Sequence, residues 1–319
     1  MIPLIDIAPL FGPPDTARDS CDAAIFAAAT GIGFLQITGP EALVPATPAV
    51  RRDLLRLFTL PEPVTHRLSR ARFVPGNPNV YRGWFPLQQG HATLKQGIDI
   101  GADLVGVPPT DGDPLCEATP LPTEAELPGW RDQAAAYYRA MAAIGRRLMQ
   151  SLARSLGLPE TQFDAAFHHG ISTLRLIHYP ARMDHDLSGA PHVDSGFVTL
   201  LAQDGVPGLQ AQTPDGGWTS VPPTEGALAV NFGLLLQRWT AGRIRATRHQ
   251  VRAGGQDRCS IPFFYEPHAQ AVIAPLPGGA DFAPFTYGDH LWAATTRFLE
   301  FRGMEALRKP SASSSVPAG

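Results

Sequence analysis

A histidine and an aspartate stand two positions apart in the segment PHVDSG at 191–196. Residues i and i+2 of a strand point to the same face, so His192 and Asp194 would direct an imidazole nitrogen and a carboxylate to one point. The chain has ten histidines, and His192 is the only one with an acidic residue two positions on. The pair predicts part of a metal site, although two unrelated polar residues on a strand would give the same pattern.

A further histidine, His249, follows in the arginine-rich segment RIRATRHQV. Two histidines and one carboxylate on a β scaffold suit non-haem Fe(II), because three protein ligands leave three coordination positions open. Zinc also accepts this set of ligands. The three residues therefore predict a metal centre, with iron as the favoured ion and zinc as its competitor.

The next expected strand carries RCS at 258–260. Arg258 and Ser260 would share one face of it, with Cys259 turned away. A guanidinium beside a hydroxyl offers a charge-assisted grip on a carboxylate. The alternative for Arg258 by itself is a solvated surface arginine, which is also our interpretation of Arg243 and Arg245.

The expected secondary structure changes from mainly helices to mainly strands at about residue 170, and these strands must position the candidate residues. The hydrophobic period becomes two, and Gly- and Pro-rich turns separate many short segments; TPDGG at 213–217 is expected to be a hairpin turn. Short strands of this kind are typical of a closed or sandwiched antiparallel sheet such as a jelly roll. The expected strands are 172–179, 196–203, 208–212, 218–221, 227–232, 243–251 and 258–266.

The first half of the chain is expected to pack helices against the outside of that sheet. The clearest helix carries Tyr137, Met141, Ile144, Leu148 and Leu152 at helical spacing and is ended by Gly157 and Pro159. The other expected elements are strands at 2–7 and 33–38, helices at 17–30 and 48–69, and a long surface loop at 102–127. We divide the chain into an N-terminal region (1–125), a jelly-roll domain with its leading helix (126–308) and a disordered tail (309–319).

Composition limits the function classes. The formal net charge of −3 gives no electrostatic reason to expect a nucleic-acid or acidic-membrane partner. Three cysteines without a Cys-x-x-Cys motif support neither a disulfide framework nor a thiolate zinc site. We read no signal peptide and no transmembrane helix, and expect a cytoplasmic protein.

In combination, HVD at 192–194, His249 and RCS resemble the Fe(II)/2-oxoglutarate-dependent dioxygenases of the isopenicillin N synthase-like superfamily. The similarity extends over most of the chain, from IPLIDIAPL through YRGWFP to a long run that begins at HVDSGFVTLLAQ. It implies a double-stranded β-helix, or jelly-roll, core in an α+β, mainly β fold. It also implies that Fe(II), 2-oxoglutarate and O₂ take part in the reaction.

The resemblance assigns roles to individual residues. His192, Asp194 and His249 would be the iron ligands, and Arg258 with Ser260 would bind the distal carboxylate of 2-oxoglutarate. Two aromatic residues have weaker assignments, because each could equally be a core side chain. Tyr179 occupies the position of a tyrosine that lies near the co-substrate in family members. Phe264 occupies the position of an aromatic residue that packs against the substrate.

The implied activity is oxidation of a small organic metabolite, by default hydroxylation, with release of succinate and CO₂. The YRGWFP segment places Arg82 and Trp84, with Tyr81 and Phe85, among the candidates for substrate contact, although a surface salt bridge is the plainer expectation for Arg82. A small organic acid, an amino-acid derivative or an aromatic metabolite would all fit. The sequence does not choose between hydroxylation, desaturation, cyclisation and ethylene formation, and it leaves the oligomeric state open.

Other functions stay open. An oxidase of the isopenicillin N synthase type would keep the iron and dispense with 2-oxoglutarate. A non-catalytic small-molecule receptor on the same fold is expected to lose a metal ligand, and a zinc hydrolase lacks its usual HExxH or GxSxG motif here. Cys259, between the two clamp residues, could make the enzyme sensitive to oxidation.

Overall fold

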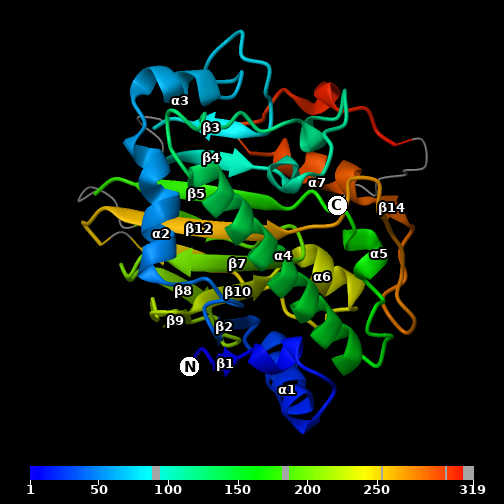
Figure 1. The fold of residues 1–319 in the computed structure, drawn as a ribbon. Helices are drawn as coiled ribbons and strands as arrows, with labels where there is room; N and C mark the ends of the chain where they lie inside the picture. Colours follow the sequence, from blue (N-terminus) through cyan, green and yellow to red (C-terminus); the bar gives the residue numbers. More distant parts are fainter. Residues whose placement is uncertain (88–93, 182–186, 253, 299, 312–319) are drawn as a thin grey trace.

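The computed structural model describes residues 1–87, 94–181, 187–252, 254–298 and 300–311. Within these ranges two antiparallel sheets face each other, and the fold is the expected jelly roll with helices outside it (Figure 1). Most of the tail predicted at 309–319 lies outside the described residues. No helix in the described ranges is long and apolar enough to cross a membrane.

The larger sheet has eight strands in the order β1-β2-β10-β7-β12-β5-β4-β3. All its pairs are antiparallel except β1–β2, which is parallel. Strands from both halves of the chain thus share one sheet, while the division at residue 125 stays a prediction. The strands are β1 (Leu4–Asp6), β2 (Phe34–Thr38), β3 (Gly83–Phe85), β4 (Gln96–Ile100), β5 (Thr173–Tyr179), β7 (Val198–Gln203), β10 (Leu228–Phe232) and β12 (Arg258–Tyr265).

The smaller sheet has the order β6-β11-β8-β9 and covers the inner face of the larger one. Apolar side chains fill the space between the two sheets, among them Phe34, Leu201, Leu209 and Val251. The hairpin expected at 213–217 joins β8 to β9. The strands are β6 (Leu187–His192), β8 (Leu209–Gln212), β9 (Trp218–Ser220) and β11 (His249–Arg252), and a separate pair joins β13 (Val272–Ile273) to β14 (Phe285–Thr286).

The long helix α4 (Trp130–Ser155) crosses the outer face of the large sheet, next to α2 (Pro48–Leu55) (Figure 1). Its apolar side is buried as the spacing predicts, and Gly157, at φ +76°, follows its end. Gly145 lets it approach closely, because a Cβ there would lie 2.5 Å from the ring of Tyr265 on β12. The odd-numbered residues of β12 therefore face this helix, and its even-numbered residues face the inside of the jelly roll.

The remaining helices surround this core. The side chain of Asp15 caps the N-terminus of α1 by accepting a hydrogen bond from the Arg18 amide. These helices are α1 (Thr16–Thr30), α3 (Glu62–Leu68), α5 (Asp164–Phe167), α6 (Leu234–Trp239) and α7 (Tyr287–Thr295).

Three expected elements were wrong in part. The helix at 48–69 is broken into α2, a 3-10 turn (Arg56–Thr59) and α3, because Pro61 holds the preceding residue extended. The loop at 102–127 is not wholly a surface loop, since Leu115 and Leu127 are buried in the core. The reason is that burying an apolar side chain is favourable in free energy, so these two leucines pack into the core although most of the loop around them is polar.

The strand expected at 243–251 was also too long, because only its end forms β11. The preceding residues instead turn through Ala241 and Gly242, both at positive φ. They then pair with the N-terminal region, where the Arg245 amide donates to the Ala29 carbonyl and the Thr247 hydroxyl donates to the Ile32 carbonyl. These long-range partners satisfy the backbone in place of a neighbouring strand.

Candidate metal centre and carboxylate clamp

Two neighbouring strands of the smaller sheet bring His192 and His249 together. His192 is the last residue of β6 and His249 is the first residue of β11, and the two are directly paired in register. Their ring centroids lie 4.2 Å apart. Strand pairing across the sheet therefore supplies the closeness that no sequence spacing could specify.

Asp194 completes the group from a loop rather than from a strand. The expectation that His192 and Asp194 share one strand face was wrong, because β6 ends at His192. The backbone carbonyl of Asp194 accepts a hydrogen bond from the Leu234 amide (2.8 Å), which ties the loop to the start of α6. Freed from the strand, the carboxylate can turn toward both histidines.

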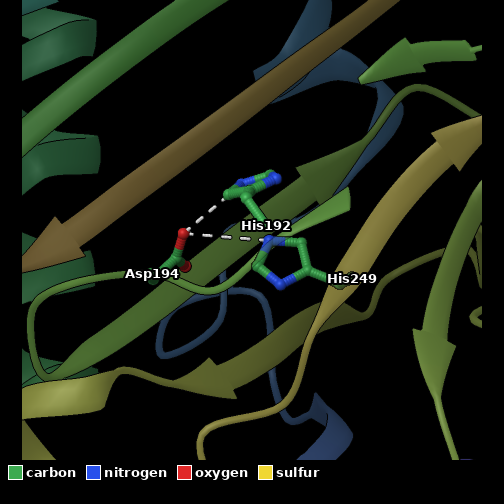
Figure 2. A group of neighbouring side chains, drawn as sticks. All are labelled: His192, Asp194 and His249. Carbon is green, nitrogen blue, oxygen red and sulfur yellow. Dashed lines mark ion pairs between the residues drawn. The ribbon is translucent and has the colours of Figure 1, made fainter. Parts of the chain in front are cut away.

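The three side chains converge as Figure 2 shows. The Asp194 Oδ1 atom lies 3.6 Å from His192 Nε2 and 3.8 Å from His249 Nε2. One ligand atom from each of the three residues lies within 4.8 Å of the others, and no second group of this kind occurs in the described ranges. The three predicted ligands are thus brought to one point.

Each histidine is oriented through its other ring nitrogen. His192 Nδ1 lies 2.8 Å from the Ala190 carbonyl, and His249 Nδ1 lies 3.1 Å from the Thr247 carbonyl. A carbonyl oxygen only accepts, so each Nδ1 carries the proton and each Nε2 presents a lone pair. This is the tautomer that a metal-binding histidine needs.

The aspartate is oriented in a similar way by two residues that the sequence analysis missed. Asp194 Oδ2 accepts hydrogen bonds from Thr199 Oγ1 (2.6 Å) and Asn231 Nδ2 (2.7 Å), which leaves Oδ1 for the histidine side. Thr199 on β7 and Asn231 on β10 are register partners in the large sheet. Their role depends on that register, and no motif in the sequence signals it.

The electrostatics favour an ionised aspartate. Burial by itself would raise the pKa of Asp194, but the charge that His249 and His192 carry when they are protonated, together with the hydrogen bonds from Thr199 and Asn231, holds it below its ordinary value. The carboxylate is therefore charged at neutral pH. A charged oxygen beside two imidazole lone pairs is a donor set that fits a divalent cation.

We expect Thr199→Val and Asn231→Ala each to weaken Fe(II) binding by about 10- to 100-fold, because they remove the groups that hold the carboxylate. Iron titration of the purified apoprotein measures this. Thr240→Val is the control, since it deletes a buried hydroxyl at the C-terminal end of α6, which donates to the Leu236 carbonyl and accepts from the Ile244 amide. Equal iron affinity in Thr199→Val and Thr240→Val would contradict the assignment.

The clamp residues lie on the inner face of β12. Arg258 and Ser260 are each 4% exposed, and Arg258 is paired with Tyr179 of β5. The Arg258 guanidinium lies 5.5 Å from the Tyr179 ring centroid. These three predicted residues are therefore adjacent.

The guanidinium of Arg258 fits an anionic guest. Its Nε and Nη2 atoms are buried and have no hydrogen-bond partner among the described residues. A buried cation without a partner is costly, and a carboxylate would supply charge and two acceptors in the geometry that guanidinium prefers. The expectation of a solvated surface arginine is wrong for Arg258.

Comparison with known proteins places this arrangement in a family. The model of the 2OG-Fe(II) oxygenase superfamily matches residues 170–267. An isopenicillin N synthase of Streptomyces clavuligerus is 31% identical over 309 residues, which cover 91% of this chain and 93% of that protein. A proline hydroxylase of Petromyces alliaceus is 31% identical over 280 residues, which cover 79% of this chain and 83% of that protein.

The chain belongs to the 2OG-Fe(II) oxygenase superfamily.

Solved structures agree on the fold. A full-length Neurospora crassa protein in complex with alpha-KG aligns with a TM-score of 0.78 at 23% identity, over 93% of this chain and 96% of that one. A putative 2OG-Fe(II) oxygenase family protein of Caulobacter crescentus aligns with a TM-score of 0.76 at 23% identity, over 93% of this chain and 99% of that one. The oxygenase therefore has the jelly-roll architecture of its relatives, and its family uses Fe(II), 2-oxoglutarate and O₂.

The candidate substrate residues of the oxygenase lie in different places. Phe264 is half-buried on the same face of β12 as Ser260, with the Arg175 guanidinium 5.6 Å from its ring centroid. Trp84 points the other way and packs against Phe58 on the helix side of the sheet, with ring centroids 5.6 Å apart. The structure therefore does not bring Trp84 to the metal centre, and its neighbour Phe85 joins Tyr179 on the inner side instead.

Arg82 is 1% exposed, so the expected surface salt bridge is wrong. Its Nη1 donates to Thr173 Oγ1 at the start of β5, and its Nη2 donates to the Ile171 carbonyl. Thr173 is the register partner of Phe264. Arg82 thus lies inside the molecule beside the residue that is expected to pack on substrate.

We expect Cys259→Ser to leave the peroxide sensitivity of the oxygenase unchanged. Burial, reinforced by Asp204 and Asp257, raises the pKa of the Cys259 thiol to about 12, so almost no thiolate forms at neutral pH, and the thiolate is the form that peroxide oxidises. The time course of inactivation by peroxide, in wild type and variant, measures this. Longer survival of the variant would show that Cys259 is a redox-sensitive site after all.

Proposed function

We propose that His192, Asp194 and His249 would hold Fe(II), because three protein ligands leave coordination positions for 2-oxoglutarate and O₂. The observation that carries the proposal is the convergence of two oriented Nε2 atoms and one charged carboxylate oxygen. When bound there, iron supplies the activation of O₂ that is coupled to decarboxylation of 2-oxoglutarate to succinate and CO₂.

In this proposal the protein residues bind and orient. Arg258 and Ser260 hold the distal carboxylate of 2-oxoglutarate, and Tyr179 packs against the guanidinium of Arg258. Support comes from two buried nitrogens of Arg258, Nε and Nη2, that have no hydrogen-bond partner among the residues that the structure describes. The buried apolar group of Phe85, Ile177 and Tyr179 keeps water away from this side of the site, which strengthens the charged contacts.

For the substrate we propose a small organic molecule and, as the reaction, its hydroxylation. Phe264 would contact it, and Arg82 is a candidate for holding a polar group. The names of relatives support the size of the substrate: one is a proline hydroxylase, and a structure of the Neurospora crassa protein is described in complex with alpha-KG and thymine. No membrane or nucleic-acid partner enters the proposal, and three free cysteines suit a reducing cytoplasm.

A second candidate is an oxidase that keeps the iron without consuming 2-oxoglutarate. The isopenicillin N synthase among the relatives, at 31% identity, favours it. The Nε and Nη2 atoms of Arg258, which have no partner in the described part of the chain, favour the 2-oxoglutarate-dependent reaction instead, because that co-substrate provides a carboxylate.

Two measurements test the proposal. Anaerobic addition of Fe(II) and 2-oxoglutarate to the enzyme is expected to give a weak visible charge-transfer band, and turnover is expected to release one succinate per product. A band that does not form in fully iron-loaded protein would overturn the assignment of the 2-oxoglutarate site. O₂ consumption with product and without succinate would establish the oxidase.

A further inference from the structure

Beyond the clamp, the inner face of β12 leads to a buried carboxyl group. Arg258, Ser260 and Phe264 alternate along this face, and Glu266 follows one residue after the strand ends. Glu266 turns inward: a Cβ on Gly196 would lie 3.1 Å from its Oε1 atom. Gly196 is two residues after Asp194, so Glu266 packs against the loop that carries this metal ligand.

Glu266 lacks the partners that a buried carboxyl group needs. It is 6% exposed, and its Oε2 atom has no hydrogen-bond partner among the described residues. The hydroxyl of Tyr287, at the start of α7, lies beside the same Gly196 position (3.6 Å). It is also buried, and the Tyr287 hydroxyl and the Glu266 carboxyl act on each other as hydrogen-bond partners, so Oε2 is the atom of Glu266 that has no partner in the described ranges.

A third buried group acts on this pair through its charge. The charge of Arg82 acts on Glu266, yet Arg82 forms no ion pair in the described part of the chain, and its Nε is buried without a partner. Buried groups with free hydrogen-bonding atoms are costly, since each unmade bond costs about 1–3 kcal/mol. Such a cluster is typical of a place that a ligand completes.

The position of the cluster fits the far end of a substrate. Phe264 is the register partner of Thr199, which holds Asp194, so this point of β12 lies next to the metal ligands. Glu266 lies two residues further along the chain, directly after the end of β12. The clamp at Arg258 and Ser260 lies in the opposite direction along β12.

All the free atoms can donate hydrogen bonds. Burial raises the pKa of the Glu266 carboxyl to about 7, so the group carries a proton in a large share of molecules at neutral pH. The Arg82 Nε–H is a donor as well, and when the protonated Glu266 carboxyl donates to a ligand through Oε2, the Tyr287 hydroxyl remains beside its other oxygen. The complementary ligand group is therefore an acceptor oxygen.

We propose that Glu266 and Tyr287, with Arg82 behind them, form the polar end of the substrate site and bind an acceptor oxygen of the substrate, a carboxylate or an amide carbonyl. This inference rests on the proposed function, because it takes the iron side of Phe264 as the place of oxidation. It adds two residues that decide which small molecules the enzyme accepts. A site built around such hydrogen bonds rejects analogues that lack the oxygen.

The test uses the anaerobic holoenzyme with Fe(II) and 2-oxoglutarate. The probes are phenylacetate, phenylacetamide and toluene, and L-proline, L-prolinamide and pyrrolidine; their binding is followed by the change in the charge-transfer band and by thermal shift. We expect at least one acid or amide to bind wild type about 10-fold or more tightly than its oxygen-free partner. Preference for the acid over the amide assigns a carboxylate, and the reverse preference assigns a carbonyl.

The variants decide which residues cause that preference. Tyr287→Phe and Glu266→Leu are expected to lose it, whereas Glu266→Gln, which keeps a donor of the same shape, retains most of it. Tyr265→Phe is the matched control, because Tyr265 packs against Gly145 on the opposite face of β12. Glu266→Gln also keeps the test valid where Glu266→Leu does not fold.

Two outcomes would overturn the inference. One is equal binding of each acid or amide and its oxygen-free partner by wild type, which would mean that the cluster holds an internal water only. The other is an unchanged preference in Tyr287→Phe and both Glu266 variants. Failure of the proposed function looks different, because then the charge-transfer band is missing before any probe is added.

Discussion

Asp194→Ala is expected to lower Fe(II) binding and 2-oxoglutarate turnover by more than about 100-fold, above the loss typical of residues that merely orient a metal ligand. The substitution removes the charged oxygen that faces both histidines. It also leaves the Thr199 hydroxyl and the Asn231 amide without their acceptor. Metal content after gel filtration and succinate formation measure the two effects.

The control for this prediction is Asp215→Ala. Asp215 is an exposed aspartate in the β8–β9 turn, where its carboxylate accepts hydrogen bonds from Thr213 and Gly217. Its loss is expected to leave iron content and turnover at the wild-type level. An Asp194→Ala protein that keeps full iron and full turnover would show that the three residues are not the metal centre.

Arg258→Ala is expected to raise the KM for 2-oxoglutarate by about 30- to several-thousand-fold, since truncating one partner of a buried charged pair costs about 2–5 kcal/mol. Iron binding is expected to change little, because Arg258 does not contact the three ligands in the described structure. Arg258→Lys is expected to fall between, because lysine keeps the charge but loses the planar fork. Steady-state kinetics with 2-oxoglutarate as the varied reactant measures this.

Arg252→Ala provides the comparison, because Arg252 is an exposed arginine at the end of β11. Its KM for 2-oxoglutarate is expected to equal that of wild type. If Arg258→Ala lowers kcat at saturating 2-oxoglutarate and leaves KM unchanged, Arg258 does not bind the co-substrate. The guanidinium would then need another partner.

The strands were the most predictable part of the fold. STLRLIHY, GFVTLLAQ and RCSIPFFYE show a period of two because the two faces of each strand have different surroundings. One face packs against the helices, and the other faces the smaller sheet. Local patterns failed where the backbone found distant partners. RIRAT alternates like a strand, yet its Arg245 amide pairs with the end of α1 and its Thr247 hydroxyl pairs with the Ile32 carbonyl, between α1 and β2.

The same division holds within the site. The types of His192, Asp194 and His249, and the Arg-x-Ser spacing at 258–260, were enough to predict a metal centre and a carboxylate clamp, because few side chains can do that chemistry. Thr199 and Asn231 could not be predicted, since a threonine and an asparagine in buried strands have no chemical signature of their own. They lie beside the candidate metal ligand Asp194 only through the register of β7 with β10.

By itself, the sequence determined which side chains were available: two imidazoles, a carboxylate, and a guanidinium beside a hydroxyl. The tertiary structure decided how they are used. It ended β6 at His192 so that Asp194 could turn, paired His192 with His249 across two strands, and buried Glu266 and Tyr287 against Gly196. The physical reason is that side-chain chemistry is a property of a residue, whereas convergence depends on strand register and burial, which the whole chain sets together.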